Sequence, residues 1–508
     1  MLQPTVLGDL RRAVAAGDIP HRSVKRELRD NLISKLRSGD RLFPGIVGYD
    51  DSVIPQIVNA VLSQHNFIIL GLRGQAKTRI LRSLVDLLDE EVPVVPGCEI
   101  NDDPLDPLCA SCRGRLQEAG EDLPVAWLPR THRFVEKLAT PDVTIADMLG
   151  DIDPIKAARA GLQLSDDLTV HYGLLPRANR GIFAVNELPD MTGKIQVGLF
   201  NILQEGDVQI KGYPVRLRLD LLLAFTANPE DYTARGKIVT PLKDRIGSEI
   251  RTHYPQTRQE AMAITEQEAW VERDSRDDNG DANAETVIPA YVRELVEEVV
   301  FQARSDQKID QRSGVSQRLS ISCLENVVSN AERRALASGE TQVVARVTDV
   351  YAALPSITGK FELEYEGELR GAENVARDLI RSAVRNIFTG WFHGVETGPV
   401  VEWFEMGGAL RLTDTTPAGE LLDQVSQIQG LAELATHAGA KDGDPAPVTA
   451  AAMDFVLEGL YAEKKISRTD EWQYRATEES SHAPRAAEQF FETGIPVQAP
   501  GKKKNYYN

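Results

Sequence analysis

The sequence predicts an α/β fold in which a parallel sheet is flanked by helices and followed by a mostly helical C-terminal region. Three observations support this prediction. An apolar run at residues 67–70 leads through a glycine-containing loop into a helical pattern. Two more apolar runs, at 182–185 and 221–225, lead into polar side chains, as buried strands of a parallel sheet often do. Beyond residue 285 the apolar positions recur mainly at helical spacing.

The length and composition indicate several domains and exclude some functions. A chain of 508 residues is too long to fold around one hydrophobic core, and its 42% of apolar residues is enough to form several. The net charge of -19 argues against general nucleic-acid binding. No apolar run approaches the roughly 20 residues that a membrane span needs, and the N-terminus lacks an apolar signal core. We therefore expect a cytoplasmic protein.

The residues before the first strand predict a helical arm and a base-binding turn. Residues 1–40 carry apolar positions at helical spacing among many charges, which predicts an N-terminal helical arm. An apolar turn, Leu-Phe-Pro-Gly-Ile-Val-Gly at 42–48, follows this arm. Because the turn lies just before the first strand, its Val47 and Gly48 are candidates for contact with an adenine ring.

Residues 67–79 form the strand, loop and helix pattern of a phosphate-binding loop. In such a loop the backbone N–H groups face the phosphates, a lysine bridges two of them and a hydroxyl binds Mg²⁺. Lys77 and Thr78 have the residue types for these roles. Ala76 replaces the usual second glycine, and we expect its backbone to keep a negative φ. The candidate nucleotide-binding residues of the loop are Gly71, Arg73, Gly74, Gln75, Ala76, Lys77, Thr78 and Arg79.

Three cysteines lie close together in an irregular segment after this helix. Cys98, Cys109 and Cys112 can hold Zn²⁺ or an iron–sulfur cluster if a fourth ligand joins them, and His132 is the nearest candidate. Redox-responsive thiols and ordinary loop cysteines are the alternatives. Cys323 falls in a helical pattern and is predicted to lie in the core.

A second strand brings a carboxylate to the predicted sheet edge. A helical, charged segment at 142–180 is followed by Gly-Ile-Phe-Ala-Val-Asn-Glu at 181–187. Glu187 at the end of this strand can polarise the water that attacks a nucleoside triphosphate. Asn186 stands where an aspartate normally organises the Mg²⁺ shell. An amide carries no charge, so we expect weaker Mg²⁺ binding and a larger contribution from Thr78.

The later part of the chain adds polar and cationic candidates. After a helix at 194–204 and a hairpin at 207–219, the strand at 221–226 leads to Asn228, which can hydrogen-bond the γ-phosphate or the water. Arg245 and Arg318 supply guanidinium groups. Two segments are predicted to be mobile, the acidic stretch 274–284 and the lysine-rich end 502–508.

The order of these elements resembles that of the AAA+ ATPases. With its inserts, the chain is similar to the helix-2-insert branch, which includes the magnesium chelatase ATPase subunit I and the MoxR-type ATPases. The resemblance covers about residues 41–355. Its marks are the string Gly-Leu-Leu-Pro-Arg-Ala-Asn-Arg-Gly-Ile-Phe-Ala-Val-Asn-Glu at 173–187, the hairpin before Ala-Asn-Pro at 227–229, and Asn-Asp-Asp-Pro at 101–104 before Cys-x-x-Cys.

The resemblance implies a P-loop core, a helical lid and roles for the candidate residues. Lys77 and Thr78 would bind ATP and Mg²⁺, with Glu187 as the catalytic glutamate, Asn228 as sensor 1, Arg245 as the arginine finger and Arg318 as sensor 2. The implied segments are an arm at 1–40, a core at 41–260 with a cysteine insert (97–125) and a helix-2 insert (142–180), a lid at 285–358 and a helical region at 359–508. An arginine finger acts across a subunit boundary, which implies a homo-oligomeric ring, expected to be a hexamer.

Three functions are open at this point. The resemblance favours an ATP-driven motor that remodels or activates a partner protein with a von Willebrand factor A domain. The authentic magnesium chelatase subunit, which drives Mg²⁺ insertion into protoporphyrin, is favoured by the cysteine insert, whereas Asn186 and residues 359–508 argue against it. The third is a nucleotide-gated scaffold with little hydrolysis, in which Asn186 helps to hold ATP.

Overall fold

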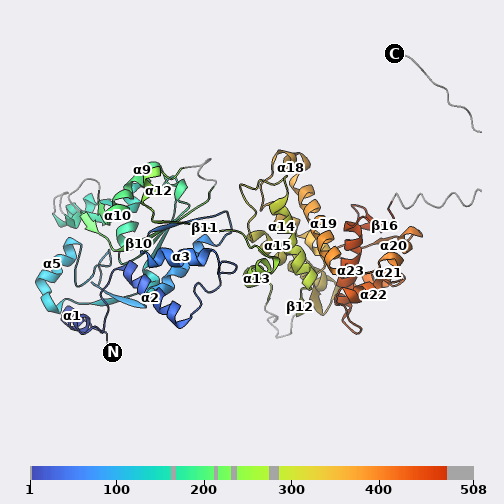
Figure 1. The fold of residues 1–508 in the computed structure, drawn as a ribbon, viewed down its shortest axis with the longest axis horizontal. Coiled ribbons are helices and arrows are strands. Elements are labelled where there is room, and N and C mark those ends of the chain that lie inside the picture. Colours follow the sequence, from blue (N-terminus) through green and yellow to red (C-terminus); the bar gives the residue numbers. More distant parts are fainter. Residues whose placement is uncertain (1–2, 162–166, 211–215, 230–236, 274–284, 478–508) are drawn as a thin grey trace, which may run out of the picture. The chain divides into compact units, whose positions relative to one another are not determined.

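The computed structural model describes residues 3–161, 167–210, 216–229, 237–273 and 285–477 (Figure 1). The two segments predicted to be mobile, 274–284 and 502–508, and the turn of the predicted hairpin at 211–215 lie outside these residues. Two compact units divide the chain. Unit 1 comprises Met1–Glu268, Ile309–Leu319 and Lys360–Glu364, and unit 2 comprises Ala269–Lys308, Ser320–Gly359 and Tyr365–Asn508.

A five-stranded sheet forms the centre of unit 1. Its order is β11-β1-β10-β7-β4, and every neighbouring pair is parallel. The strands are β1 (Phe67–Leu70), β4 (Phe134–Leu138), β7 (Gly181–Asn186), β10 (Leu221–Ala227) and β11 (Ser248–Arg251). The carboxyl ends of parallel strands meet at one edge, so the residues after β1, β7 and β10 lie close together. The predicted α/β fold class is confirmed.

Apolar residues cover both faces of this sheet. Along β1, Ile68 and Leu70 belong to one core cluster, whereas Phe67 and Ile69 belong to the other. A strand buried on both faces needs a continuous apolar sequence, which explains the run at 67–70. The helices that contribute to the two cores include α1 (Leu7–Ala16), α2 (Val24–Ser38), α3 (Val53–Leu62), α4 (Lys77–Ser83), α9 (Gly193–Gly198), α10 (Phe200–Gln204) and α12 (Thr240–Arg245).

A buried ion pair attaches the N-terminal helices to the sheet. Glu27 on α2 accepts hydrogen bonds from both terminal nitrogens of Arg133, at 2.7 and 2.6 Å. Their side chains are only 3% and 1% exposed. Removing one partner would leave a buried charge unpaired, which typically costs about 3–5 kcal/mol. The described part of the predicted arm, residues 3–40, therefore belongs to the packed body of unit 1.

The inserts contain short antiparallel pairs as well as helices. In the first, β2 (Glu91–Val94) pairs with β3 (Ala126–Pro129), and α5 (Ala110–Ala119) lies between them in sequence. In the second, β5 (Gly150–Ile152) pairs with β6 (Val170–Tyr172), so the helical prediction for 142–180 is wrong at these strands. On β6 the exposed His171 alternates with two buried neighbours, which is the period of a strand. The helices of this insert are α6 (Ile145–Met148), α7 (Pro154–Ala160) and α8 (Leu174–Arg177).

The predicted hairpin after α10 is present. Its strands β8 (Asp207–Gln209) and β9 (Arg216–Arg218) pair antiparallel. Unit 1 also contains α13 (Arg258–Glu268), whose residues reach the nucleotide-binding region described below.

Unit 2 is mostly helical, as predicted. Its longer helices are α14 (Ala290–Ser305), α15 (Arg318–Ser338, from Ser320 on), α19 (Ala372–Trp391) and α23 (Ala446–Ala462). The remaining elements are α16 (Val347–Ala352), α17 (Leu354–Thr358), α18 (Tyr365–Arg370), α20 (Gly398–Glu405), α21 (Ala418–Val425), α22 (Leu431–His437), and the strands β12 (Glu285–Val287), β13 (Gln342–Val344), β14 (Leu410–Arg411), β15 (Ser467–Arg468) and β16 (Gln473–Arg475). Within the described ranges, no helix combines the length and apolar character that a bilayer crossing requires.

Candidate nucleotide-binding site

The loop between β1 and α4 has the close backbone approaches that its glycines suggested. A Cβ atom on Gly71 would lie 1.7 Å from the hydroxyl oxygen of Thr252, and one on Gly74 would lie 2.1 Å from that of Ser316. Gly74 also has a φ of +75°, which side chains rarely adopt. Neither position accepts a side chain without a shift of the surrounding residues.

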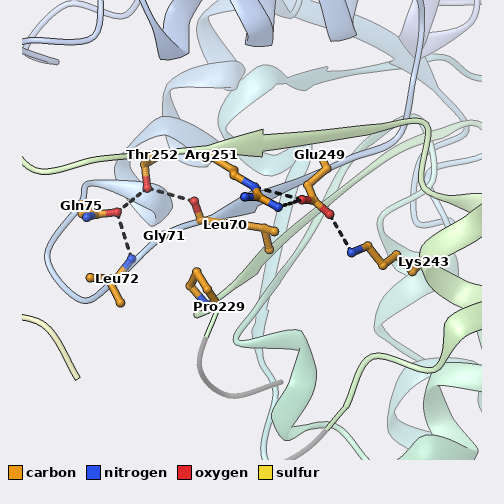
Figure 2. A pocket seen from close by; sticks show the side chains of 9 residues that line it. All are labelled: Leu70, Gly71, Leu72, Gln75, Pro229, Lys243, Glu249, Arg251 and Thr252. Atoms are coloured by element: carbon orange, nitrogen blue, oxygen red, sulfur yellow. Dashed lines mark hydrogen bonds and ion pairs between the residues drawn. The ribbon is translucent and has the colours of Figure 1, made fainter. Parts of the chain in front are cut away.

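Two polar side chains fix the shape of this loop. The amide oxygen of Gln75 accepts hydrogen bonds from the N–H of Leu72 at 2.9 Å and from the hydroxyl of Thr252 at 2.7 Å (Figure 2). Gln75 is 6% exposed, so these bonds are shielded from water. Thr252 follows β11 and was not predicted as a site residue, because nothing in its local sequence points to the loop.

Ala76 contradicts the expectation of a negative φ. Its backbone has φ 54° and ψ 15°, in the left-handed region, and α4 begins at the next residue. This conformation costs an L-residue with a Cβ roughly 1–2 kcal/mol. The loop therefore holds a strained residue directly before Lys77.

Lys77, Glu187 and the loop carbonyls converge at the sheet edge. The ammonium of Lys77 donates to the carbonyl oxygens of Gly71 and, at 3.2 Å, Leu72. It also lies 4.0 Å from a carboxylate oxygen of Glu187. The Lys77 side chain is 8% exposed and that of Glu187 is 34% exposed. The carboxylate is thus accessible to water while remaining beside the phosphate loop.

A hydrogen-bond network joins Thr78 to Asn186. The amide oxygen of Asn186 accepts from the hydroxyl of Thr78 at 3.3 Å and from that of Thr226 at 3.1 Å. The Thr226 hydroxyl in turn accepts from the backbone N–H of Glu187 at 3.1 Å. The residues predicted to serve Mg²⁺ and water activation therefore share one network.

Glu136 on β4 completes this network and was not predicted. Its carboxylate accepts a hydrogen bond from the side-chain amide of Asn186 and another, at 2.8 Å, from Arg82. The parallel register of β4 against β7 pairs Glu136 with Ala184, two residues before Asn186. A carboxylate therefore contacts the position where the usual aspartate is missing.

Asn228 lies at the end of β10 with an unsatisfied polar atom. It is 6% exposed, and its side-chain oxygen is buried without a hydrogen-bond partner among the described residues. Leaving such a group unpaired typically costs about 1–3 kcal/mol. A ligand or its water shell at this edge would satisfy the amide, which fits the predicted contact with a γ-phosphate or an attacking water.

A cavity lies beside the loop, where the sequence predicts contact with an adenine ring. Val47 from the predicted turn and Ala76 and Arg79 from the loop region line it. Tyr49 braces the cavity, because its hydroxyl donates to the carbonyls of Gln75 at 3.2 Å and His253 at 2.8 Å. The full lining is Gly45, Ile46, Val47, Tyr49, Gly74, Gln75, Ala76, Arg79, His253, Pro255, Ile264, Gln267 and Gln317.

Gly48 does not line this cavity. It has a φ of +78°, and an added Cβ would lie 3.2 Å from the carboxylate carbon of Glu260. Its place in the structure is the turn next to Val47, which does line the cavity. The residues that α13 and the segment after β11 contribute to the cavity were not predicted, because only the fold brings them to the turn.

The loop arginines pair with acidic residues. Arg73 lies 2.9 Å from Glu362, and both side chains are about half exposed. Arg79 forms an ion pair with Glu268 and lines the base cavity. Exposed pairs of this kind contribute little stability, so both guanidinium groups can exchange partners at low cost.

Arg318 and Arg245 occupy different surroundings. Arg318 opens α15, and its N–H donates to the hydroxyl of Ser316 at 3.1 Å, the same oxygen that approaches Gly74. Arg245 ends α12 and donates to Gln204 at 3.0 Å. Among the described residues, no contact links Arg245 to the phosphate loop of its own chain. The roles predicted for both arginines remain predictions.

A second cavity, of about 320 Å³, borders the loop (Figure 2). Three charged residues on its wall pair with one another, since Glu249 lies 3.1 Å from Lys243 and 3.0 Å from Arg251. The rest of its lining is Leu70, Gly71, Leu72, Gln75, Pro229 and Thr252. The single carboxylate of Glu249 is therefore shared by two cationic side chains.

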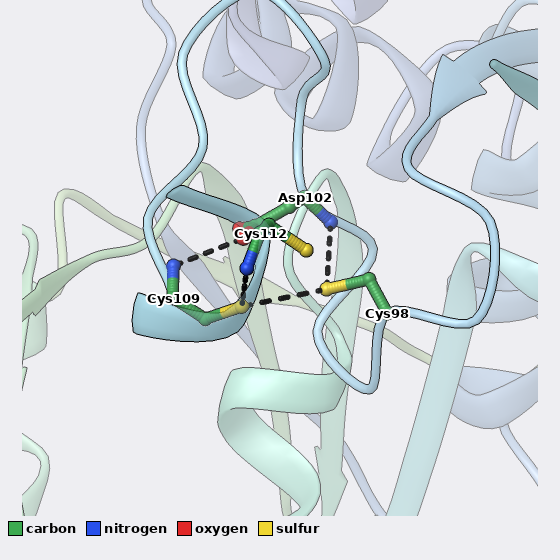
Figure 3. A group of neighbouring side chains, drawn as sticks. All are labelled: Cys98, Asp102, Cys109 and Cys112. Carbon is green, nitrogen blue, oxygen red and sulfur yellow. Dashed lines mark hydrogen bonds between the residues drawn. The ribbon is translucent and has the colours of Figure 1, made fainter. Parts of the chain in front are cut away.

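The predicted cysteines come together, but with a different fourth residue. One potential ligand atom from each of Cys98, Asp102, Cys109 and Cys112 lies within 4.8 Å of all the others (Figure 3). Hydrogen bonding with Cys109 lowers the pKa of Cys98 to about 4 and raises that of Cys112, and burial raises the pKa of Asp102 to about 7. The choice of His132 is wrong for this group, because that residue lies exposed after β3.

Comparison with known proteins supports the resemblance. The magnesium-chelatase subunit ChlI of Oryza sativa subsp. indica is 28% identical over 328 residues, which cover 62% of this chain and 74% of that protein. The corresponding subunit of Chlorella vulgaris is 26% identical over 326 residues, which cover 62% of this chain and 86% of that protein. No protein-family model matches the chain.

Among solved structures, a chain from a cryo-EM-based complex of the BchI and BchD subunits of magnesium chelatase aligns with 19% identity and a TM-score of 0.35. The alignment covers 65% of this chain and 98% of that chain.

Proposed function

We propose that this chain, which is an AAA+ ATPase related to the ChlI subunit of magnesium chelatase, uses ATP hydrolysis in a ring to remodel or activate a partner protein. One observation carries the proposal. Lys77 and Glu187 lie 4.0 Å apart at the edge where the loop after β1 meets the end of β7. A cation for phosphate and a carboxylate for water thus face the same space.

ATP would bind at this edge with its base and its phosphates in separate places. The cavity around Val47 and Tyr49 would take the base. The glycines of the loop leave room for the backbone to approach the phosphates, and Lys77 would exchange its bonds to the carbonyls of Gly71 and Leu72 for bonds to phosphate oxygens.

Glu187 would orient the attacking water and accept its proton. The ammonium of Lys77 lies 4.0 Å from this carboxylate, and the attraction between the two groups would help to keep Glu187 at the sheet edge. Asn228, whose buried oxygen has no partner among the described residues, would hold the water or the terminal phosphate. These two side chains come from neighbouring strands, so their spacing is set by the sheet.

Thr78 and Asn186 would hold Mg²⁺, and Glu136 would support them through its hydrogen bond with Asn186. The ion would supply positive charge that offsets the negative charge of the phosphate groups during hydrolysis. Thr78 offers a hydroxyl and Asn186 an amide oxygen, and these two atoms are already 3.3 Å apart. Glu136 supplies the negative charge that Asn186 lacks, acting through its hydrogen bond with the Asn186 amide.

Arg245 supports the proposal of a ring, and the inserts support the proposal of a partner protein. Arg245 makes no contact with its own phosphate loop among the described residues, so a neighbouring subunit is where its guanidinium would act. A hexamer is the expected ring. The partner protein is expected to contain a von Willebrand factor A domain, and the inserts that carry β5–β6 and β8–β9 would transmit the motion.

Magnesium chelation is the second candidate, because the relatives above are named as magnesium-chelatase subunits. In that case this chain would drive Mg²⁺ insertion into protoporphyrin when mixed with the other chelatase subunits. Metalloporphyrin formation that depends on this chain and on ATP favours chelation. If the chain hydrolyses ATP but no combination of subunits forms metalloporphyrin, the remodelling motor is favoured.

Two variants test the proposed ATPase site. Lys77→Ala should abolish ATP binding, and Glu187→Gln should bind ATP but hydrolyse it about 100-fold or more slowly. Nucleotide binding is measured with a fluorescent ATP analogue and turnover by phosphate release. Glu373→Gln, on the exposed face of α19, is the matched control and should behave like the wild type. Unchanged affinity in the first variant or unchanged turnover in the second would refute the assignment.

The same variant identifies the partner and tests the scaffold alternative. Glu187→Gln held in ATP should retain the partner during affinity purification, and a von Willebrand factor A domain should be found in it. A wild-type protein without any Glu187-dependent turnover would instead favour a nucleotide-gated scaffold.

A further inference from the structure

Three thiols and one carboxylate meet in the first insert, outside the network of Lys77 and Glu187. Cys98 and Asp102 come from the loop after β2, while Cys109 and Cys112 lie at the start of α5 (Figure 3). The sulfur atoms of Cys98 and Cys109 are 4.0 Å apart. Tetrahedral Zn²⁺ with bonds of about 2.3 Å holds its sulfur ligands roughly 3.8 Å apart. The observed separation therefore needs little change to accept an ion.

Asp102 contributes a buried carboxylate oxygen that points to a ligand. It has no exposed surface, and one carboxylate oxygen accepts from the N–H of Cys109 at 2.9 Å. The other oxygen is buried without a hydrogen-bond partner among the described residues. A buried carboxylate oxygen is normally paired, because desolvating it without compensation is costly. A metal ion among the three sulfurs would supply the missing partner.

The backbone around the cysteines is arranged for thiolate ligands. The sulfur of Cys98 accepts from the N–H groups of Ile100 at 3.4 Å and Asp102 at 3.5 Å. The sulfur of Cys109 accepts from the N–H of Cys112 at 3.3 Å. Such outer hydrogen bonds orient metal ligands and offset part of their negative charge. The insert thus provides ligands and their supporting bonds together.

We propose that Cys98, Cys109, Cys112 and Asp102 form a four-coordinate structural Zn²⁺ site. Zn²⁺ accepts cysteine sulfur and aspartate oxygen in the same tetrahedral shell. Iron–sulfur clusters are held by four cysteines, or by cysteines with histidines, and this group offers a carboxylate instead. A disulfide needs a separation of about 2.05 Å between sulfur atoms, whereas Cys98 and Cys109 are 4.0 Å apart.

The burial of the group indicates a structural role. Cys109 and Cys112 are 5% and 1% exposed, which leaves no open coordination position for a substrate. Cys112 is also the one residue of α5 that is buried, among those the structure describes there. The ion would therefore anchor α5 and the loop before it to the core of unit 1.

Metal analysis of the full chain, purified anaerobically without chelators, tests the site. We expect about one zinc ion per chain in the wild type, and removal of the ion by a chelator should lower the melting temperature. Adding Co²⁺ to the chelator-treated protein should give the absorption bands of tetrahedral cobalt with thiolate ligands. Absence of zinc, or iron with inorganic sulfide in its place, would overturn the proposal.

Variants identify the ligands. Cys109→Ser should lose the zinc, and Asp102→Asn should weaken its retention against a chelator by about 10-fold or more. Cys323→Ala and His132→Ala are the matched controls and should keep it. If Cys109→Ser fails to fold, the cobalt spectrum and the chelator titration of the wild type still decide the question. Zinc loss in the histidine control, or a Cys98–Cys109 disulfide found by mass spectrometry in the anaerobic protein, contradicts the site.

Discussion

Glu136→Gln tests whether a carboxylate on β4 replaces the aspartate that is missing from β7. The substitution keeps the size of the side chain and removes its charge. In the structure Glu136 contacts the amide of Asn186, whose oxygen accepts from Thr78 at 3.3 Å. Its other partner, Arg82, is 65% exposed, so the loss of that ion pair has little effect on stability.

The expected magnitude follows from this position behind the Mg²⁺ ligands. Removing an outer partner of a metal ligand typically weakens metal binding about 10- to 100-fold, or about 1.4–2.7 kcal/mol. The Glu136 side chain is only 23% exposed, so water can do little to compensate for the loss of its negative charge. We therefore expect the Mg²⁺ concentration for half-maximal turnover to rise by that factor, with little change in the rate at saturating Mg²⁺.

The assay is ATP hydrolysis at saturating ATP over a range of Mg²⁺ concentrations. Asn186→Asp combined with Glu136→Gln moves the charge to β7 and keeps the number of polar atoms, so it should restore the wild-type Mg²⁺ dependence. Arg82→Ala is the control for the ion pair and should leave that dependence unchanged. Equal Mg²⁺ curves for Glu136→Gln and the wild type, or an equal shift in the arginine control, would refute the reasoning.

Three further outcomes are expected. Arg245→Ala should bind ATP but not hydrolyse it, and mixing it with Lys77→Ala should restore turnover, which phosphate release measures; failure in every mixture contradicts action in trans. Ala76→Gly removes the strain of an alanine in the left-handed region, while glycine gives the unfolded chain more conformational freedom. We expect the first effect to dominate, so the free energy of unfolding should rise by about 0.5–1 kcal/mol. A lower free energy of unfolding in urea titrations would contradict this. Burial raises the pKa of Asp454 from 3.8 to about 7, so the folded state binds the proton more tightly and its stability should fall from about pH 4 to pH 7. Asp454→Asn should flatten that fall, and an unchanged slope in tryptophan-monitored unfolding would contradict this.

The strands that carry motifs could be predicted because their signals are local. β1, β7 and β10 are buried on both faces, so each shows a largely apolar run, which leads into the glycine-containing loop after β1 and into polar residues at the ends of β7 and β10. The glycines of the loop mark the close approaches to Thr252 and Ser316 without naming those partners. Sequence patterns therefore place the elements of the site but not the residues that reach it from elsewhere.

β4 was missed for a physical reason. It lies at the edge of the sheet, and none of its residues is fully buried. Its sequence, Phe-Val-Glu-Lys-Leu at 134–138, consequently lacks the apolar run of a central strand. Asp102 escaped prediction in the same way, because an aspartate in a Pro- and Asp-rich loop looks like an ordinary solvated residue until its burial is known. The left-handed conformation of Ala76 could not be predicted either, because the neighbouring residues in the sequence do not determine its φ.

Asn186 and Glu136 can only be understood as a pair. The asparagine accepts from Thr78 and Thr226 through its oxygen and donates to Glu136 through its nitrogen. An aspartate at 186 would accept the first two bonds, but it would place a second negative charge against Glu136 and leave no donor between them. Like charges at such a distance raise each other's pKa and repel when no cation is bound. An uncharged residue at 186 keeps the hydrogen bonds of this network satisfied, and we expect Glu136 to supply the negative charge at this edge when Mg²⁺ binds.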